Sequence, residues 1–511
     1  MLRLGLSSPT LKESHMRFPR SSGSLLHPTS LPGPYGIGDL GEEARHFVDF
    51  LWLSGQKVWQ VLPLGPTGFG DSPYQCFSAF AGNPYLVSPD RLVQDDLLTA
   101  VEASAHPVFP DTVVDFGPVI SWKQALLARA AARFAANHAH PLQEVFEAWC
   151  KARPWLDDFA LFMALKDAHG GASWDVWPQA LRQREPRALA DARLHLAAGV
   201  HANQFAQWCF DHQWQQVRAY AHSRGIHLLG DVPIFVSYDS ADVWVRPDLF
   251  HLDHGGRPTV VAGVPPDYFS ETGQLWGNPL YRWDAAASEG YQWWADRLRA
   301  TLQQVDRIRL DHFIGFTRCW EVPAGAPDAR KGRWMPGPGA ALFEALGRHL
   351  GALPLVAEDL GELSPEVARM RDHFEFPGMR ILQFAFTGPE NPFLPHHHVP
   401  NALVYSGTHD NDTAMGWWNS APEGERDFAR RYLGIDGHDF AWDLIRAGMM
   451  SVADGFIAPV TDVLSLGGEA RMNLPGRANG NWSWRLPAGA LTPELAYRWR
   501  VLAEMYGRCD S

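Results

Sequence analysis

The sequence lacks the features that mark several classes of protein. It has five cysteines in 511 residues, and none forms a CxxC pair, so a disulfide framework is excluded and a reducing cytoplasm is the expected location. No apolar run reaches the length of about 18 residues that a membrane-spanning helix needs. Lys+Arg 44 against Asp+Glu 57 gives a net charge of −13, so we expect neither nucleic-acid nor membrane partners.

Signatures of several reaction types are also missing. Gly65, Gly68 and Gly70 lie in the stretch GPTGFGDSPY, but no GK[ST] follows, which favours a turn over a phosphate loop. No HExxH motif is present, and the consecutive histidines at 396–398 cannot converge on one ion, so we expect no metal site. No GxSxG motif occurs, and no cysteine stands in a nucleophile signature. We therefore expect a reaction without metal or cofactor.

Tryptophan, by contrast, is abundant, with 22 residues. The indole N–H needs a partner when it is buried, so a surplus is typical of flat faces that line clefts and stack on sugar rings or other planar groups. Core packing in a large protein is the alternative interpretation, and it stays open for each tryptophan.

Short apolar runs bounded by turns alternate with segments of helical periodicity. Such runs are typical of strands buried on both faces, and their alternation with helices indicates a parallel sheet. Strands are expected at 57–64, 227–236, 307–312, 354–359, 380–386, 402–410 and 456–464. Helices are expected at 42–53, 124–136, 155–165, 204–224, 292–305, 340–350, 365–373, 423–433 and about 492–508.

Four of these strands end on acids, namely Asp231, Asp311, the pair Glu358 and Asp359, and Asp410. In α/β barrels the catalytic groups lie at the C-terminal ends of the strands, because the βα loops gather on that face. Four acids on separate strands indicate a ring of carboxylates around one cleft. This pattern favours a closed (β/α)8 TIM barrel over an open sheet.

We expect one catalytic barrel over residues 21–511, preceded by an extension, 1–20, that is frayed or follows a misassigned start, with Met16 as the functional first residue. Two segments interrupt the alternation: a helical insertion at about 89–198 and an aromatic, loop-like subdomain at about 246–283. A loop of that length is expected to be a lid or a binding element. The sequence after the last strand holds one helix and leaves no room for a C-terminal β-sandwich.

Two of the acids lie in contrasting surroundings. Arg309 and Asp311 share one face of their strand, so the guanidinium favours the ionised carboxylate that a nucleophile requires. Glu358 follows the apolar run 354–357, which disfavours its charged form and suits a proton donor. In the alternative interpretation, Asp311 caps a helix and Glu358 is a solvated loop acid.

Long motifs cover most of the chain. They include GDSPYQCFSAFAGNPYL (70–86), GDVPIFVSYDSADVW (230–244), RLDHFIGF (309–316), AEDLG (357–361), SGTHDNDT (406–413) and EARMNLPG (469–476). On these motifs, from about residue 22 to the C-terminus, the chain resembles the amylomaltase, or disproportionating 4-alpha-glucanotransferase, family of the α-amylase clan. The resemblance implies a (β/α)8 barrel that transfers α-1,4-glucan segments to the 4-hydroxyl of an acceptor glucan or glucose with retention, and without a cofactor.

The resemblance also implies roles for individual residues. Asp311 in RLDH matches the family's nucleophile, Glu358 in AEDLG its acid/base, and Asp410 in GTHDNDT its third carboxylate. Retention then implies that the carboxyl groups of Asp311 and Glu358 lie about 5–5.5 Å apart. The other residues of the expected glucan-binding site are Ser72, Tyr74, Asp231, Tyr268, Phe269, Trp276, Arg309 and His409. Among them Tyr74 matches the aromatic that stacks on the donor sugar, and the aromatic loop is expected to hold acceptor sugars and exclude water.

The chain departs from the family's usual pattern at Ile314 and Thr461, which affects the expected acceptor or chain-length preference rather than the chemistry. It also has Phe69 where a tyrosine is common, which affects a peripheral glucan contact. Two other functions stay open: a retaining α-glucan hydrolase on the same barrel, and a catalytically silent glucan-binding protein. The long aromatic loop argues against the first, and the three intact carboxylates argue against the second. The expected partners are α-1,4-glucans such as maltooligosaccharides, amylose and glycogen-type chains; the oligomeric state does not follow from the sequence.

Overall fold

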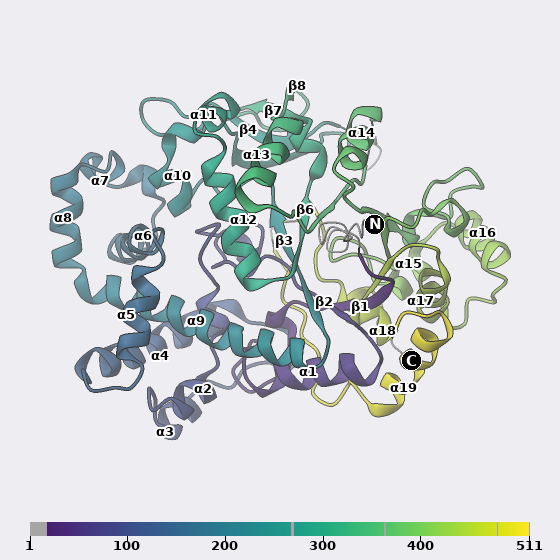
Figure 1. Ribbon diagram of the computed structural model, residues 1–511, viewed down its shortest axis with the longest axis horizontal. Helices are drawn as coiled ribbons and strands as arrows, with labels where there is room; N and C mark the ends of the chain where they lie inside the picture. Colours follow the sequence, from purple (N-terminus) through teal and green to yellow (C-terminus); the bar gives the residue numbers. More distant parts are fainter. Residues whose placement is uncertain (1–17, 267–269, 362–363, 478, 510–511) are drawn as a thin grey trace, which may run out of the picture.

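The computed structural model describes residues 18–266, 270–361, 364–477 and 479–509. Eight parallel strands form the central sheet: β1 (Ser21–Leu25), β2 (Val58–Gln60), β3 (His227–Pro233), β6 (Arg307–Asp311), β9 (Leu355–Ala357), β10 (Gly378–Ile381), β11 (Ala402–Tyr405) and β12 (Gly455–Pro459). They pair in chain order, and β12 pairs with β1. The Ala357 N–H donates to the Pro377 carbonyl (2.9 Å), which joins β9 to the start of β10 and closes the sheet. The predicted (β/α)8 barrel is confirmed (Figure 1).

The first barrel strand, β1, is absent from the seven strands that the apolar pattern predicts. Its sequence, SSGSL, is mostly polar, yet every residue in it is buried. The Ser24 hydroxyl donates to the Ala458 carbonyl (2.9 Å), and a Cβ at Gly23 would come within 2.2 Å of the Val58 carbonyl oxygen. Small residues with hydrogen-bond partners therefore replace the Val/Ile/Leu run by which a buried strand is recognised.

Helices surround the barrel, and several have the predicted bounds. These are α1 (Glu42–Leu53), α13 (Ala340–Leu350), α14 (Pro365–His373) and α16 (Glu423–Leu433). The remaining helices that follow barrel strands are α9 (Ala197–Ser223), α11 (Trp283–Ser288), α12 (Gln292–Gln304), α15 (Ala414–Ser420), α17 (Phe440–Met450), α18 (Val460–Val463) and α19 (Pro493–Met505). The terminal helix α19 packs on α1, where the rings of Phe50 and Trp499 lie 6.3 Å apart. In the described chain after β12, up to residue 509, no further strand follows, and one isolated bridge joins Trp484 to Val113.

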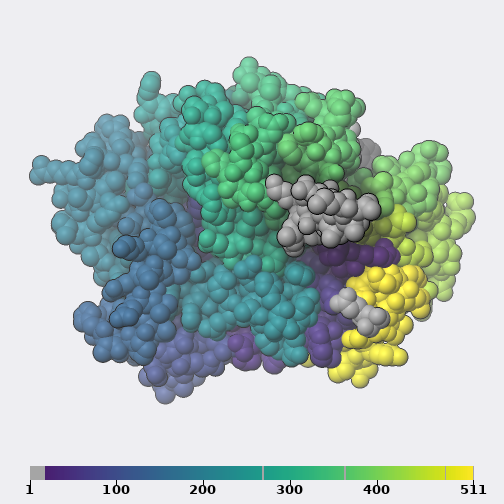
Figure 2. Space-filling model, viewed as in Figure 1, coloured from purple at the N-terminus to yellow at the C-terminus, as the bar shows by residue number. Residues whose placement is uncertain are grey.

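Residues 89–198 are helical. They form α2 (Pro89–Gln94), α3 (Ala100–Ser104), α4 (Phe116–Ala136), α5 (Gln143–Lys151), α6 (Leu156–Ala168), α7 (Gln179–Arg182) and α8 (Pro186–His195). These helices occupy the left-hand and lower-left part of the molecule in Figures 1 and 2, beside the barrel. They pack on the long helix α9, for example where the rings of Phe134 and Trp208 stack at 5.6 Å.

The segment 246–283, which the sequence predicts to be loop-like, contains two strands of a second sheet. In this antiparallel sheet, β4 (Val260–Val264) pairs with β5 (Gln274–Pro279) and with β7 (Arg318–Pro323), and β7 pairs with β8 (Arg333–Pro336). The short helix α10 (Ala241–Val245) precedes the segment. The strands are short and β4 and β5 each contain a glycine, so their pattern does not distinguish them from loops. Because β7 follows β6 closely, the sheet belongs to the C-terminal end of the barrel.

Half of the 22 tryptophans are buried in the core. Those among the largest fully buried side chains are Trp59, Trp208, Trp214, Trp244, Trp294 and Trp499. For these residues the core-packing interpretation is correct. Phe18 is also buried, and Arg20 donates to the Ser451 carbonyl (3.0 Å), so the folded structure includes residues inside the expected extension. Met16 lies outside the described residues. No helix that the structure describes is both long and apolar enough to cross a membrane.

Candidate active site

A buried arginine joins two carboxylates at the C-terminal ends of adjacent strands. Asp231 on β3 is the register partner of Arg309 on β6. The Nη1 atom of Arg309 lies 2.7 Å from Asp231 Oδ2 and 2.9 Å from Asp311 Oδ1. The side chains of Arg309 and Asp231 are buried, whereas that of Asp311 is 26% exposed. Of the two carboxylates bound to the guanidinium, Asp311 is therefore the one that a substrate can reach.

Burial and the neighbouring charges together set the protonation of Asp231 and Arg309. Burial raises the pKa of Asp231 to about 6, against the effect of Arg309 and with the help of the Asp311 charge. Burial alone would lower the pKa of Arg309, but Asp231 and Asp311 outweigh it and hold that pKa well above its ordinary value. Asp231 Oδ2 also accepts a hydrogen bond from the Tyr74 hydroxyl (3.0 Å), while Oδ1 has no partner in the part of the chain described. Arg309 thus stays a cation beside Asp311.

Glu358 directly follows β9 and is bound by two backbone amides. Its Oε2 accepts the His312 N–H (2.7 Å), and its Oε1 accepts the Leu360 N–H (3.0 Å). Burial raises the pKa of Glu358 to about 8; Arg309 and the two amides oppose this rise, and the Asp311 charge adds to it. A carboxyl with such a pKa keeps its proton at neutral pH, as a general acid requires.

His312 makes the turn that brings these two carboxyls together. It follows Asp311 and has φ 54°, a left-handed conformation that is uncommon for a residue other than glycine. Its N–H donates to Glu358 Oε2, so the residue next to Asp311 is hydrogen-bonded to the second carboxyl. Burial lowers the pKa of His312 to about 4, although Asp311 opposes this. The neutral imidazole lies edge-on to Trp276 on β5, with ring centroids 4.8 Å apart.

Asp410 follows β11 and is positioned by three polar side chains. Asn473 Nδ2 donates to its Oδ1 (2.6 Å), His409 Nε2 lies 3.2 Å from its Oδ2, and Arg471 Nη2 donates to its carbonyl oxygen (2.5 Å). Burial acts to raise the pKa of Asp410, but His409, Asn473 and Arg309 outweigh it and hold that pKa well below its usual range. Asp410 is therefore an anion at any physiological pH.

Three rings connect the Asp231 side of the site to the Asp410 side. The rings of Tyr74 and His409 stack with centroids 5.1 Å apart, and Trp482 lies 5.7 Å from the first and 5.9 Å from the second. Ser72 Oγ accepts the Tyr74 N–H (3.2 Å), which fixes the backbone before this ring. Two hollows adjoin these rings. One is lined in part by Tyr74 and Asp231, and the other in part by His409.

Most of the predicted site residues come together around one end of the barrel, namely Ser72, Tyr74, Asp231, Arg309, Asp311, Glu358, His409 and Asp410. Trp276 contacts this group through His312. Tyr268 and Phe269 lie outside the described residues. The sequence reasoning gave no role to His312, Asn473, Arg471 and Trp482. The first three lie inside the motifs RLDH and EARMNLPG, so the motifs marked their positions but not their contacts.

The consecutive histidines at 396–398 bind three different partners. The first binds the Tyr432 hydroxyl (2.8 Å), the second the Pro389 carbonyl (3.1 Å) and the third the Ser451 hydroxyl (2.8 Å). Each histidine of this run is thus held by its own hydrogen-bond partner.

Comparison with known proteins identifies the family of this barrel. The sequence model of the 4-alpha-glucanotransferase family matches residues 26–492. The chain belongs to the 4-alpha-glucanotransferase family. The 4-alpha-glucanotransferase of Thermus thermophilus is 52% identical over 499 residues, which is 96% of this chain and 99% of that protein. That of Synechocystis sp. is 48% identical over 495 residues, 96% of this chain and 98% of that protein.

Solved structures agree with this assignment. The amylomaltase from Streptococcus agalactiae, determined in complex with acarbose, matches with a TM-score of 0.94 and 36% identity, covering 96% of this chain and 100% of that one. The amylomaltase from Corynebacterium glutamicum matches with a TM-score of 0.75 at 17% identity, and shares the fold. The resemblance to the amylomaltases is thus confirmed, and this glucanotransferase is a hexosyl-transferring enzyme.

Proposed function

We propose that Asp311 is the nucleophile and Glu358 the acid/base with which this glucanotransferase moves α-1,4-glucan segments from a donor to the 4-hydroxyl of an acceptor. The observation that carries the proposal is the contrast between the two carboxyls at the ends of β6 and β9. Asp311 is paired with the Arg309 guanidinium and reaches solvent, whereas Glu358 has a raised pKa and keeps its proton. Two carboxyls with different protonation preferences define an acid–base pair.

In the first step, an oxygen of the Asp311 carboxylate attacks C1 of the donor sugar, and Glu358 gives its proton to the leaving glycosidic oxygen. The C1–O bond breaks, a glycosyl ester forms on Asp311, and the leaving chain departs with a free 4-hydroxyl. In the second step, the Glu358 carboxylate takes the proton of an acceptor 4-hydroxyl, whose oxygen attacks C1 and releases Asp311. Two inversions give net retention, with the carboxyls expected about 5–5.5 Å apart.

The other predicted residues support these two steps in the proposal. The Asp410 carboxylate binds hydroxyls of the distorted donor sugar and strengthens that contact in the transition state. Tyr74 provides a flat surface for the donor sugar, with His409 stacked on its ring. Arg309, itself bound by Asp231, holds the Asp311 carboxylate, and Ser72 holds the backbone of Tyr74. Trp276, together with Tyr268 and Phe269, holds acceptor sugars and excludes water, which favours transfer over hydrolysis.

The proposed partners are neutral α-1,4-glucans: maltooligosaccharides, amylose and glycogen-type chains. Support comes from the names of the relatives, from acarbose bound to the Streptococcus agalactiae amylomaltase, and from the net charge of −13, which suits an uncharged polymer better than a polyanion. The five cysteines, all within the described residues, are free thiols. This favours the cytoplasm as the proposed location.

The test is incubation of the purified protein with maltotriose, followed by chromatography of the products. We expect glucose and a ladder of longer maltooligosaccharides with little increase in total reducing ends. Growth of reducing ends without longer products would instead indicate a hydrolase, and unchanged maltotriose would indicate a glucan-binding protein.

The roles of the two carboxyls are tested by substitution. Asp311→Asn and Glu358→Gln are expected to be folded but slower by several orders of magnitude, since each removes a group that acts on the reacting bond. Glu504→Gln, which changes an exposed carboxylate on α19, is the matched control and should keep full activity. Near-normal turnover in either active-site variant would remove that residue from its proposed role.

A further inference from the structure

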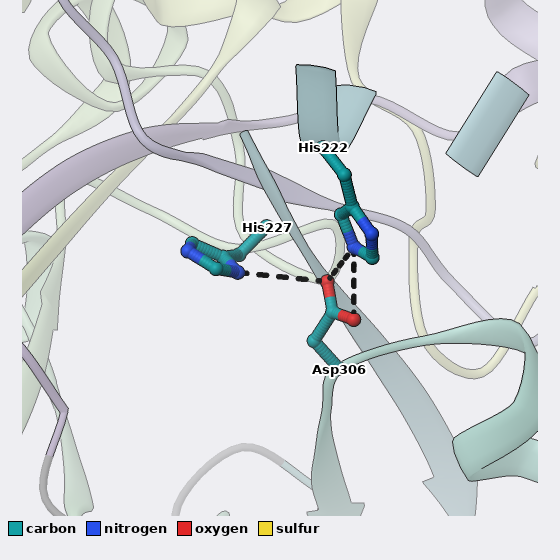
Figure 3. Close-up of side chains that lie close together, drawn as sticks. All are labelled: His222, His227 and Asp306. Atoms are coloured by element: carbon teal, nitrogen blue, oxygen red, sulfur yellow. Dashed lines mark hydrogen bonds and ion pairs between the residues drawn. The ribbon is translucent and has the colours of Figure 1, made fainter. Parts of the chain in front are cut away.

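A cluster of two histidines and one aspartate lies at the opposite end of the strands that carry Asp231 and Asp311. His222 is in the last turn of α9, His227 begins β3, and Asp306 directly precedes β6 (Figure 3). His222 Nε2 lies 2.9 Å from Asp306 Oδ2 and 3.0 Å from Oδ1, and His227 Nδ1 lies 3.8 Å from Oδ2. One nitrogen or oxygen atom from each side chain lies within 4.8 Å of the others.

These atoms have the identity of a transition-metal ligand set, and shifts of about 1 Å in two exposed imidazoles would give them tetrahedral spacing. Two imidazole nitrogens and one carboxylate oxygen form a typical ligand set for Zn²⁺, with metal–ligand bonds of about 2.0–2.2 Å. Such bonds place neighbouring ligand atoms about 3.3–3.5 Å apart. The two contacts to Asp306 Oδ2, at 2.9 and 3.8 Å, lie on either side of this value. The side chains of His222 and His227 are 39% and 62% exposed, so an ion and a fourth, water ligand can reach them from solvent.

The carboxylate of Asp306 is already oriented by other groups. The Leu228 N–H donates to its Oδ2 (2.8 Å), and Arg218 Nη2 lies 2.8 Å from its Oδ1. Metal-bound carboxylates commonly accept such hydrogen bonds, which fix their direction. Arg218 also cancels the charge of Asp306, so the group offers little attraction to hard cations. Selection therefore depends on the two imidazoles, which favour Zn²⁺ and similar ions over Ca²⁺ or Mg²⁺.

We propose that His222, His227 and Asp306 bind one divalent transition-metal ion of the Zn²⁺ type, which joins the C-terminal end of α9 to the starts of β3 and β6. A strand rises about 3.3 Å per residue, so the five-residue step from Asp306 to Asp311 along β6 spans about 16 Å. The ion at Asp306 is therefore far from the Asp311 carboxylate. The N-terminal face of such barrels serves stability rather than chemistry. The ion therefore stabilises the folded enzyme and takes no part in glucan transfer.

The test begins with protein freed of metal by a chelator, which is then removed. Titration with ZnCl₂ by calorimetry and thermal unfolding is expected to show a binding event and a rise in Tm. His222→Gln and His227→Gln are each expected to weaken this binding at least about tenfold, and the double variant should lose the Tm rise. His212→Gln, on the same helix and bonded to Gln216, is the matched control and should behave as the wild type. CaCl₂ should give no comparable effect.

The position of the ion is checked separately, because calorimetry does not show which residues bind Zn²⁺. Crystals grown with Zn²⁺ are expected to give an anomalous difference peak between His222, His227 and Asp306. Turnover of maltotriose by metal-free wild type and by the double variant should be equal, which shows that the variant folds and that the result is independent of the proposed function. Unchanged Zn²⁺ binding in the double variant, or a peak only at other residues, would overturn the proposal, as would the absence of any binding to the wild type.

Discussion

The protonation of Glu358 is expected to set the upper pH limit of the first chemical step. In the proposed mechanism Glu358 must carry its proton to release the leaving chain, and burial raises its pKa to about 8 from an ordinary value near 4.5. The acid form is therefore available at neutral pH and is lost as the pH rises through about 8. We expect kcat/KM for maltotriose to fall above this pH, as measured between pH 5 and 10.

A donor that needs no protonation provides the control for this profile. Maltosyl fluoride loses fluoride without an acid, so its first step should not show the alkaline decline. A decline for maltotriose centred near pH 4.5 would contradict the raised pKa. The same shift has a consequence for stability, because the folded state binds this proton more tightly than the unfolded state. That stabilisation is complete below the unfolded pKa and is lost as the pH rises through about 8.

Asn473 is expected to position Asp410 for binding the sugar. Its side-chain amide donates to Asp410 Oδ1 (2.6 Å), and hydrogen bonds to a charged group contribute about 1.5–3 kcal/mol. Asn473→Ala should therefore lower kcat/KM roughly tenfold to 150-fold, and Asn473→Asp should lower it further, because it places a second negative charge beside Asp410. Steady-state kinetics on maltotriose measure both.

The control for this prediction is Asn391→Ala, which removes an exposed amide bonded to Phe384 and Thr387. It should leave kcat/KM unchanged. Equal kinetics in Asn473→Ala and the wild type would show that Asp410 needs no such partner.

The sequence could identify the carboxylates of the site and Arg309 beside Asp311, but not every group that holds them. Asp231, Asp311 and Asp410 were predictable because each ends or follows an apolar strand, and such ends meet on one face of a barrel. The contact of Asn473 with Asp410 bridges 63 residues, and no periodic pattern encodes it. The left-handed turn at His312 is equally hidden, since the usual signal for a positive φ is glycine.

At the scale of helices and strands, the elements with long and regular apolar patterns were the ones that the sequence predicted correctly. Helices such as α1 and α13 repeat their apolar positions over three turns, and their bounds match the prediction. Strands β1 and β4 are five residues long, contain glycine and lie in long-range pairings. Their burial depends on neighbours distant in the chain, so local sequence carries little of the signal.

The second sheet is expected to favour transfer over hydrolysis through Trp276. This side chain on β5 lies against His312, the residue after the proposed nucleophile. Trp276→Ala removes a flat apolar surface, which should weaken acceptor binding and admit water. We expect the ratio of hydrolysis to transfer to rise roughly threefold to tenfold, a change of about 0.6–1.4 kcal/mol in relative barriers. Reducing-end release and ladder formation from maltotriose measure this ratio.

A second tryptophan of the same sheet serves as the control. Trp334 on β8 packs against Trp320 and Arg318 rather than His312. Trp334→Ala should leave the ratio unchanged. An equal rise in both variants would assign the effect to the stability of the sheet instead of the contact with His312.

At the scale of the whole molecule, the two ends of the described chain meet at the N-terminal side of the barrel. Arg508, after α19, is fully buried and donates to the carbonyls of Ser21, Gly448 and Met449 (2.9, 3.2 and 2.7 Å). The last two carbonyls belong to the final turn of α17, beyond its regular i→i−4 hydrogen bonds, and that of Gly448 also accepts the Ser451 N–H (3.2 Å). One side chain thus connects the first barrel strand, the helix before the last strand and the terminal helix.

Arg508→Met is expected to lower the free energy of unfolding by about 3 kcal/mol or more. Methionine fills similar space but donates no hydrogen bonds, and each buried carbonyl left unpaired costs about 1–3 kcal/mol. Arg500→Met is the control, because Arg500 is an exposed residue of α19 paired with Glu504, and such pairs contribute about 0.5 kcal/mol or less. Urea unfolding measures both variants. Turnover at 25 °C should be unchanged, because the site lies at the other end of the barrel; equal stability of the two variants would show that the chain ends close the barrel without Arg508.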